Sequence, residues 1–211
     1  MPRIYVLAGV NGAGKSSVVG SRIREVGMQY FNPDEAAAAI REESGCSLDE
    51  ANGRAWTEGK ERLEQAIRDR RDFSFETTLG ANTIPRLLQQ AADEGFEVRV
   101  WFVGLASVEQ HMARVRARVA SGGHDIPEEK IRERWEGSRR NIIRLMQHLT
   151  ELFVYDNSAE RDPVTGDNPP PRLLLHWKRG TIAGPSLAEL QQTPEWAKPI
   201  LAAALHLTRR N

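Results

Sequence analysis

Short apolar runs alternate along the chain with longer segments whose apolar residues recur at helical spacing. Ile4 to Ala8 is an uncharged apolar run that leads into glycine, which predicts a buried strand entering a loop. Apolar residues between Val18 and Val26 then follow at intervals that place them on one face of a helix. The same pattern predicts strands near 28–31, 72–76, 97–105 and 152–155, and helices within 34–72 (broken between Ser44 and Gly53) and near 84–94, 107–120 and 127–149. Strands that alternate with helices are typical of an α/β domain with a mainly parallel sheet flanked by helices.

The C-terminal part of the chain has a different pattern. Residues 159–171 are polar and end in three prolines, which predicts a surface loop. Leu173–Trp177 and Thr181–Ala183 are separated by a short turn, so we expect an antiparallel hairpin at the edge of the sheet. Thr193-Pro194 marks the start of a terminal helix. We therefore expect one domain over residues 1–211, with this hairpin and helix at about 172–209.

Composition narrows the class of protein. With 211 residues, 40% hydrophobic and 27% charged, the chain has enough apolar surface for a packed core, which excludes a disordered protein. Lys plus Arg and Asp plus Glu both number 29, and this zero net charge does not favour a nucleic-acid partner. The single Cys46 excludes an intramolecular disulfide. No apolar run approaches the roughly 18 residues that span a bilayer, and no signal-peptide core follows Met1, so we expect a cytoplasmic protein without a membrane partner.

The segment Gly9-Val-Asn-Gly-Ala-Gly-Lys-Ser16 fits the P-loop pattern. Its glycines allow several backbone amides to point into one concave site for phosphate oxygens. Lys15 is placed to reach the β and γ phosphates, and the Ser16 hydroxyl to bind Mg²⁺. A chance glycine-rich turn is the alternative, but the predicted strand before the motif and helix after it favour a nucleoside triphosphate site.

Asp34 follows the second predicted strand, at the sheet edge where ligands of such folds bind. A carboxylate there can accept the proton of a substrate hydroxyl that attacks the γ phosphate. The alternative is structural, with Asn32-Pro33 forming a turn and Asp34 capping the next helix.

Glu76, Thr77 and Thr78 end the third predicted strand. Glu76 is a candidate ligand for Mg²⁺ or its waters, and the threonines are candidates for hydrogen bonds to a substrate or a phosphate. The alternative is that these side chains only cap the strand and form the turn.

Arg114 and Arg118 lie four residues apart and share one face of a predicted helix. Two guanidinium groups on one face can clamp a phosphoryl group during transfer, although a solvated basic face is the usual meaning of such a pair. Gly122-Gly123-His124 follows and predicts a flexible joint, so we expect a lid over about 107–141, with Arg134 as a further clamp residue. His111, His148, His176 and His206 lack ligand-like spacing and are expected to be structural.

Taken together, these spaced elements resemble the zeta-toxin family of P-loop kinases over about residues 1–185. The matching pieces are Gly9 to Ser17, Asn32-Pro33-Asp34, Phe75-Glu76-Thr77-Thr78, Arg114 to Pro127, Arg134-Trp135 with Ser138 and Asn141, and Tyr155-Asp156-Asn157-Ser158. Members of that family use ATP or GTP to phosphorylate small molecules, several of them the 3′-hydroxyl of UDP-N-acetylglucosamine.

The resemblance implies a role for each matched residue. It assigns the nucleotide to Gly9, Asn11, Gly12, Ala13, Gly14, Lys15, Ser16, Ser17 and Asn157, the last of them near the adenine. It assigns Mg²⁺ to Ser16 and Glu76, and the acceptor to Asn32, Asp34, Glu76, Thr77 and Thr78, with Asp34 as the general base. It assigns the γ phosphate to Lys15 and to Arg114 or Arg118, with His124 or Arg134 in the second lid position.

The expected function is therefore that of a kinase for a sugar nucleotide, with UDP-N-acetylglucosamine as the expected acceptor and ATP (or GTP) with Mg²⁺ as the phosphate source. The chain can be a toxin whose partner is a small helical antitoxin, or a stand-alone metabolic kinase. Two alternatives stay open at this point: a kinase for another acceptor (a nucleoside, a dinucleotide or an antibiotic), and a nucleotide-switch ATPase module.

Overall fold

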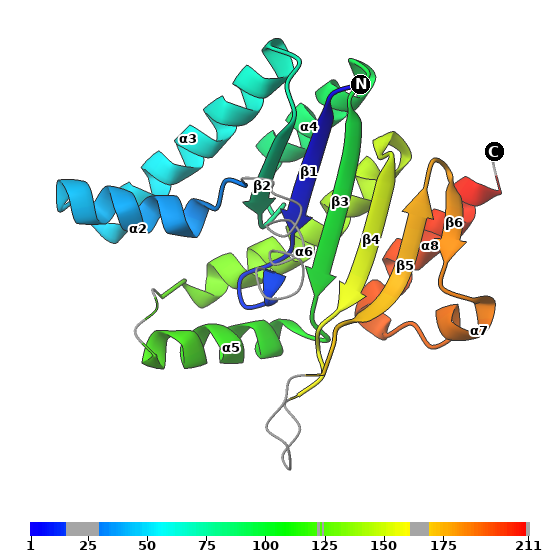
Figure 1. Ribbon diagram of the computed structural model, residues 1–211. Coiled ribbons are helices and arrows are strands. Elements are labelled where there is room, and N and C mark those ends of the chain that lie inside the picture. The colour runs from blue at the N-terminus through cyan, green and yellow to red at the C-terminus, as the bar shows by residue number, and fades with distance from the viewer. Residues whose placement is uncertain (16–29, 122, 124, 161–168, 210–211) are drawn as a thin grey trace.

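A computed structural model of the chain shows a six-stranded sheet with helices packed against it (Figure 1). It describes residues 1–15, 30–121, 123, 125–160 and 169–209. The strand order is β2-β1-β3-β4-β5-β6, in which the first four strands are parallel and β5 and β6 are antiparallel. The strands are β1 Arg3–Ala8, β2 Phe73–Thr77, β3 Glu97–Gly104, β4 Glu151–Asp156, β5 Arg172–Lys178 and β6 Thr181–Gly184. The expected α/β fold with a mainly parallel sheet and a C-terminal hairpin is confirmed.

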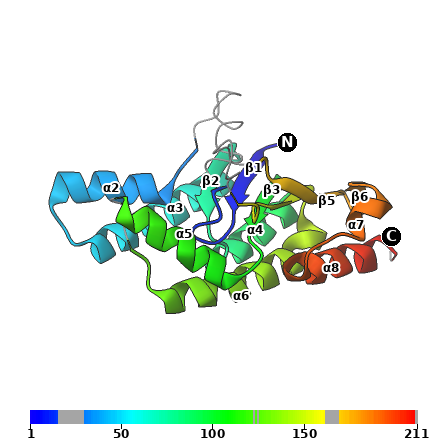
Figure 2. The same ribbon diagram turned by 90° about the horizontal axis from the view of Figure 1, so that it is seen from below.

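Three helices cover one face of this sheet, namely α4, α6 and α8 (Figure 2). The other helices lie at its edge or beside its carboxyl-terminal end. The helices are α2 Pro33–Ser44, α3 Leu48–Arg68, α4 Thr83–Asp93, α5 Val108–Ala120, α6 Glu128–Leu145, α7 Leu187–Leu190 and α8 Lys198–Thr208, with short 3-10 turns at Met146–His148 and Glu195–Ala197. None of the described helices is both long and apolar enough to cross a lipid bilayer.

The core follows from the strand alternation. Ile4, Val98 and Val100 point to the helix-covered face and are fully buried, together with Trp177 of β5, whose indole N–H donates to the Met146 carbonyl at 3.1 Å. On the opposite face the rings of Tyr5, Trp101 and Phe153 stack across three neighbouring strands, with centroids 6.1 and 5.7 Å apart. Aromatic residues suit such cross-strand positions because their faces cover the pleated backbone.

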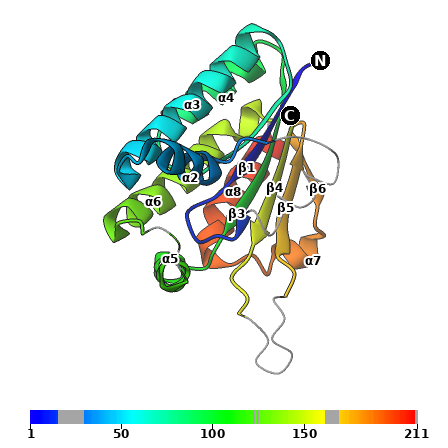
Figure 3. The same cartoon turned by 60° about the vertical axis from the view of Figure 1, so that its left-hand side comes forward.

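Helices α2 and α3 form a hairpin that stands beside β2, away from the C-terminal half of the sheet (Figure 3). Asn32 caps α2, and Gly45 in the left-handed conformation (φ 66°) ends it. Ser47 caps α3 through a hydrogen bond from the Glu50 amide at 3.2 Å. The expected helix break is therefore only three residues long, because Ala51 to Gly53 already belong to α3.

One expected strand differs from the structure, and one observed helix has no counterpart among the expected elements. Of the strand expected at 28–31, residues 28 and 29 lie outside the described residues, and Phe31 makes a single parallel bridge to Phe75 of β2. Helix α7 was not expected; Ser186 and Glu189 stabilise its start through a capping box. The helix expected after the P-loop motif also lies outside the described residues.

Helix α6 touches the loop after β2 at Gly137. A methyl group added there would lie 2.1 Å from the Gly80 carbonyl oxygen, whereas one added at Gly53 of α3 would meet nothing within 4 Å. We expect Gly137→Ala to lower the free energy of unfolding by about 1–3 kcal/mol, because a packed backbone must move. Gly53→Ala should raise it by about 0.5–1 kcal/mol, because alanine favours an exposed helix. Urea unfolding of both variants measures this; equal effects would contradict the close packing of α6 on this loop.

Candidate functional site

The P-loop motif directly follows β1, at the edge of the sheet where the parallel strands end. Gly12 and Gly14 have φ values of 80° and 79°, which side-chain-bearing residues rarely adopt, so the loop conformation depends on both glycines. The loop starts beside β2, since the Gly9 amide donates to the Thr77 carbonyl at 3.2 Å. Ser16 and Ser17, the expected Mg²⁺ and nucleotide ligands, lie outside the described residues.

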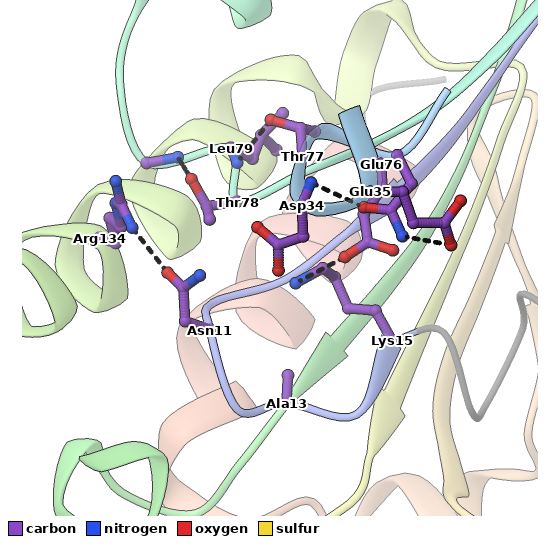
Figure 4. A network of polar contacts seen from close by, with 12 residues as sticks. Asn11, Ala13, Lys15, Asp34, Glu35, Glu76, Thr77, Thr78, Leu79 and Arg134 are labelled. Carbon is purple, nitrogen blue, oxygen red and sulfur yellow. Dashed lines mark hydrogen bonds and ion pairs between the residues drawn. The ribbon is translucent and has the colours of Figure 1, made fainter. Parts of the chain in front are cut away.

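Lys15 forms an ion pair with Glu76 at the centre of the site (Figure 4). The Lys15 Nζ lies 3.2 Å from the Glu76 Oε1, and the two side chains are only 8% and 10% exposed. The pairing of β1 with β2 explains the meeting, because the loop that follows β1 and the end of β2 lie at the same edge of the sheet. An ammonium held this far from water needs an anionic partner, and a phosphate can take the place of the carboxylate.

Asp34 lies in the first turn of α2, but Asn32 is the residue that caps this helix. The Asn32 Oδ1 accepts a hydrogen bond from the Asp34 amide at 2.9 Å, and its Nδ2 donates to Glu35 at 3.1 Å. The capping alternative for Asp34 is therefore wrong, because the cap comes from Asn32. The Asp34 carboxylate instead faces Arg118, whose Nη1 is 3.6 Å from its Oδ2.

The end of β2 and the loop after it carry Thr77, Thr78 and a strained residue, Leu79. The Leu79 amide donates to the Thr77 hydroxyl at 3.1 Å and the Gly80 amide to the Thr78 hydroxyl at 3.4 Å, so the threonines do form the turn. Leu79 is buried with a φ of 58°, a conformation that costs free energy for a leucine. Asn141 of α6 holds this turn by donating to the Leu79 and Ala81 carbonyls at 2.8 and 3.0 Å.

Three side chains from distant parts of the chain hold the P-loop from outside. Arg134 of α6 donates to the Asn11 Oδ1 at 2.8 Å (Figure 4). His111 of α5 contacts the Asn11 carbonyl through Nδ1, also at 2.8 Å. The Asn157 side-chain amide donates to the Ala13 carbonyl at 2.8 Å. Asn157, which the resemblance assigns to the adenine, therefore lies beside the P-loop. His111, which is expected to be structural, contacts the same loop.

Arg114 connects α5 to the segment after β4, because its Nη2 donates to the Asn157 carbonyl at 2.8 Å. Burial lowers the pKa of Arg114 from its ordinary value, while Asp156 and Glu160 raise it. Burial likewise lowers the pKa of Arg134, whereas the negative charge of Asp34 raises it. A guanidinium stays protonated in proteins, so both groups are cations near the loop.

His111 is almost completely buried, at 1% exposure. Burial lowers the pKa of its imidazole from 6.5 to about 4; the hydrogen bond to Asn11 raises it, and the nearby charges of Lys15 and Arg114 lower it further. The Nδ1 atom must carry the proton, because the Asn11 carbonyl oxygen can only accept. The ring is therefore neutral at physiological pH.

A cavity of about 510 Å³ opens beside these groups, a size that suits a small-molecule ligand. Lys15, Asp34, Glu76 and Arg134 line it, together with Trp56 of α3, which is 46% exposed. Tryptophans are expected to pack in the core or to border a cleft, but no motif distinguishes Trp56 among the five of this chain, because its place at the cavity depends on the α2–α3 hairpin.

The structure thus brings seven of the expected site residues to one cavity, whereas Asn32, Arg114 and Arg118 do not line it. Asn11, Lys15, Asp34, Glu76, Thr77, Thr78 and Arg134 all line this cavity. His124 lies outside the described residues. Among the described residues no three His, Cys, Asp or Glu side chains group to hold a metal ion. Mg²⁺ bound with a nucleotide commonly takes one or two protein ligands, and the Glu76 carboxylate fits that role.

The neutral state of His111 has a consequence for acid stability. Between pH 6.5 and about 4 the unfolded chain binds a proton at His111 that the folded chain does not, so acidification lowers the free energy of unfolding. The full difference, from 6.5 to about 4, corresponds to about 3 kcal/mol. We expect His111→Asn to lose less stability than the wild type when urea unfolding is compared at pH 7 and pH 4.5. The control His206→Asn, at an exposed position of α8, should keep the wild-type pH dependence; an unchanged dependence in His111→Asn would contradict the buried neutral ring.

Comparison with known proteins places the chain among related sequences. Residues 4–142 match the family described as AAA domain. An uncharacterized protein of Haemophilus influenzae is 32% identical over 127 residues, which cover 60% of this chain and 88% of that protein.

Solved structures share the fold at low sequence identity. The AvrRxo1-ORF1:-ORF2 complex aligns with a TM-score of 0.65 and 16% identity, covering 98% of this chain and 71% of that chain. A structure of that complex with ATP gives the same score and identity, and there the match covers 97% of this chain and 64% of the other, less than two thirds of it. The PezAT chromosomal toxin-antitoxin system of Streptococcus pneumoniae aligns with a TM-score of 0.58 and 15% identity, covering 100% of this chain and 87% of that chain.

The sequence match spans well over half of the chain and includes the P-loop, Asp34, Glu76 and helix α5. The chain therefore belongs to the AAA domain family, and its fold is that of the P-loop kinases.

Proposed function

We propose that the chain is a small-molecule kinase that transfers the γ phosphate of ATP to a hydroxyl group. The observation that carries this proposal is the meeting of Lys15, Asp34 and Arg134 at one cavity beside the P-loop. A phosphate cradle alone serves many NTPases, whereas a carboxylate in the same cavity gives an acceptor hydroxyl a place to lose its proton.

The nucleotide binds to the P-loop, with its phosphates on the backbone amides and on Lys15. On binding, the Lys15 ammonium exchanges the Glu76 carboxylate for phosphate oxygens, and Glu76 becomes available to Mg²⁺ together with Ser16. The ion supplies charge neutralisation at the phosphates. The structure of a protein with this fold in complex with ATP supports the choice of ATP.

The acceptor occupies the cavity, with its hydroxyl beside Asp34. The hydroxyl oxygen attacks the γ phosphorus, the bond from that phosphorus to the bridging oxygen of ADP breaks, and the hydroxyl proton passes to the Asp34 carboxylate. Asp34 is suited to this because Asn32 takes over the helix cap and α2 directs the carboxylate toward the cavity. Thr77, Thr78 and Glu76 line the acceptor side.

Cations stabilise the negative charge of the transferring group. Arg118 lies 3.6 Å from Asp34 and Arg134 lines the same cavity, so both stand near the position of the γ phosphate. We propose that α5 and most of α6 form the lid, over about residues 107–141. The lid and the rest of the chain then belong to a single kinase domain. Arg114, which contacts the segment after β4, is placed to hold the base of that lid.

UDP-N-acetylglucosamine is the acceptor that we favour, on the resemblance to zeta toxins. A cavity of about 510 Å³ has room for part of such a molecule. The structural similarity to the PezAT toxin-antitoxin system supports a second element of the proposal, an antitoxin protein that covers the nucleotide site. A kinase for another small acceptor is the competing assignment, and the identity of the phosphorylated product separates the two.

Replacement of the proposed base tests the reaction. Asp34→Asn should lower the rate of ADP formation in the presence of acceptor by at least about a hundredfold, because the proton of the hydroxyl has no acceptor. Its affinity for Mg-ATP should change little, because Asp34 contacts the attacking hydroxyl rather than the P-loop. Coupled ADP release gives the rate and calorimetric titration gives the affinity.

Glu42→Gln is the matched control, because it neutralises an exposed carboxylate of the same helix far along from the cavity. It should retain wild-type transfer. Full turnover in Asp34→Asn would remove Asp34 from the mechanism.

A further inference from the structure

His111 lies where helix α5 comes closest to the P-loop. A methyl group added to Gly12 would be 2.8 Å from the His111 carbonyl oxygen, so the two backbones are in direct contact. On the same side, the His111 Nδ1 lies 2.8 Å from the Asn11 carbonyl oxygen, across 100 residues of sequence. The side chain and the backbone of His111 therefore both contact the turn at residues 11 and 12.

The contact with the Asn11 carbonyl determines where the next amide points. In a planar trans peptide the carbonyl and the N–H of the following residue point in opposite directions. With the Asn11 carbonyl turned toward His111, the Gly12 N–H is turned away from α5. Arg134 holds the Asn11 side chain at the same time, so this residue is fixed at both of its polar ends.

The same arrangement recurs two residues later in the loop. The Asn157 side chain donates to the Ala13 carbonyl at 2.8 Å, which turns the Gly14 N–H to the opposite side. Two alternate peptide groups of the loop are thus held by their carbonyl oxygens from outside. This leaves the amides of both glycines directed away from the residues that hold the loop.

His111 can act in this way only as a donor from Nδ1. Its Nε2 is buried and has no hydrogen-bond partner among the described residues, so a second proton there would be an unsatisfied charge facing Lys15 and Arg114. The ring is thereby restricted to the neutral form with the proton on Nδ1.

We propose that His111 is a positioning residue for the nucleotide: through the Asn11 carbonyl it turns the Gly12 amide toward the bound triphosphate. This inference rests on the proposed nucleotide site and adds to it a residue outside the P-loop motif. His111 does not touch the nucleotide, and its effect is on the geometry of one amide donor.

Calorimetric titration of the full chain with Mg-ATP tests the proposal. His111→Leu removes the donor and should raise the Kd for ATP about tenfold, the worth of one hydrogen bond to a charged group. His111→Asn keeps an amide N–H near the position of Nδ1 and should restore the Kd to within about threefold of the wild type. Ile200→Ala, which removes buried packing of α8 in a core cluster that contains no P-loop residue, should destabilise the protein and leave the Kd unchanged.

The outcomes separate this inference from the proposed function. If the wild type binds ATP and Lys15→Ala does not, while His111→Leu binds like the wild type, the role of His111 is overturned and the nucleotide site stands. Equal weakening in His111→Leu and Ile200→Ala also overturns it, because the effect would then follow from stability. A folded wild type that binds no ATP overturns both.

A spectroscopic measurement covers the case in which His111→Leu fails to fold. Long-range proton–nitrogen NMR spectra of the wild type at pH 7, with His111 assigned by its loss in His111→Asn, should show a neutral ring protonated at Nδ1. A ring protonated at Nε2 would overturn the proposal, because it could not donate to the Asn11 carbonyl.

Discussion

A lysine ammonium held almost out of water is the constraint around which this structure is arranged. Lys15 and Glu76 are each at most 10% exposed and lie 3.2 Å apart. A charge in such a place is tolerated only with an opposite charge beside it. The parallel pairing of β1 and β2 supplies the carboxylate, and the adjoining cavity gives a phosphate access to the same ammonium. This arrangement supports the proposed exchange of the Glu76 carboxylate for a phosphate at Lys15.

The P-loop itself cannot maintain this arrangement, because glycine gives its turn many alternatives. The polar side chains that hold it come from α5, from α6 and from the segment after β4: His111, Arg134 and Asn157. Helix α5 also carries Arg118, which we propose acts on the γ phosphate together with Arg134. Any movement of α5 and α6 toward a nucleotide would thus be transmitted directly to the loop that binds it.

Much of the fold follows from local patterns. The apolar run of β1, the apolar residues of β3 and the helical spacing in α4, α5 and α6 predict elements close to their observed bounds. Glu76 and Asp34 are predictable as candidate site residues, because Glu76 lies at the carboxyl end of β2 and Asp34 closely follows Phe31, which bridges to the same strand. Asn32 as the cap of α2, by contrast, depends on which of several side chains reaches the first turn. His111 and Trp56 reach the site only through helix packing between residues far apart in the sequence, and no local pattern marks such contacts.

Transfer of a phosphate to an identified acceptor is the most direct measurement of the central claim. Purified protein is incubated with Mg-ATP and UDP-N-acetylglucosamine, with Lys15→Ala as the blank, and the products are resolved by mass. The account predicts a product heavier by one phosphate that is absent from the blank. Consumption of ATP without that product would assign the kinase to another acceptor. A folded wild type that neither consumes ATP nor transfers phosphate would contradict the assignment as a kinase.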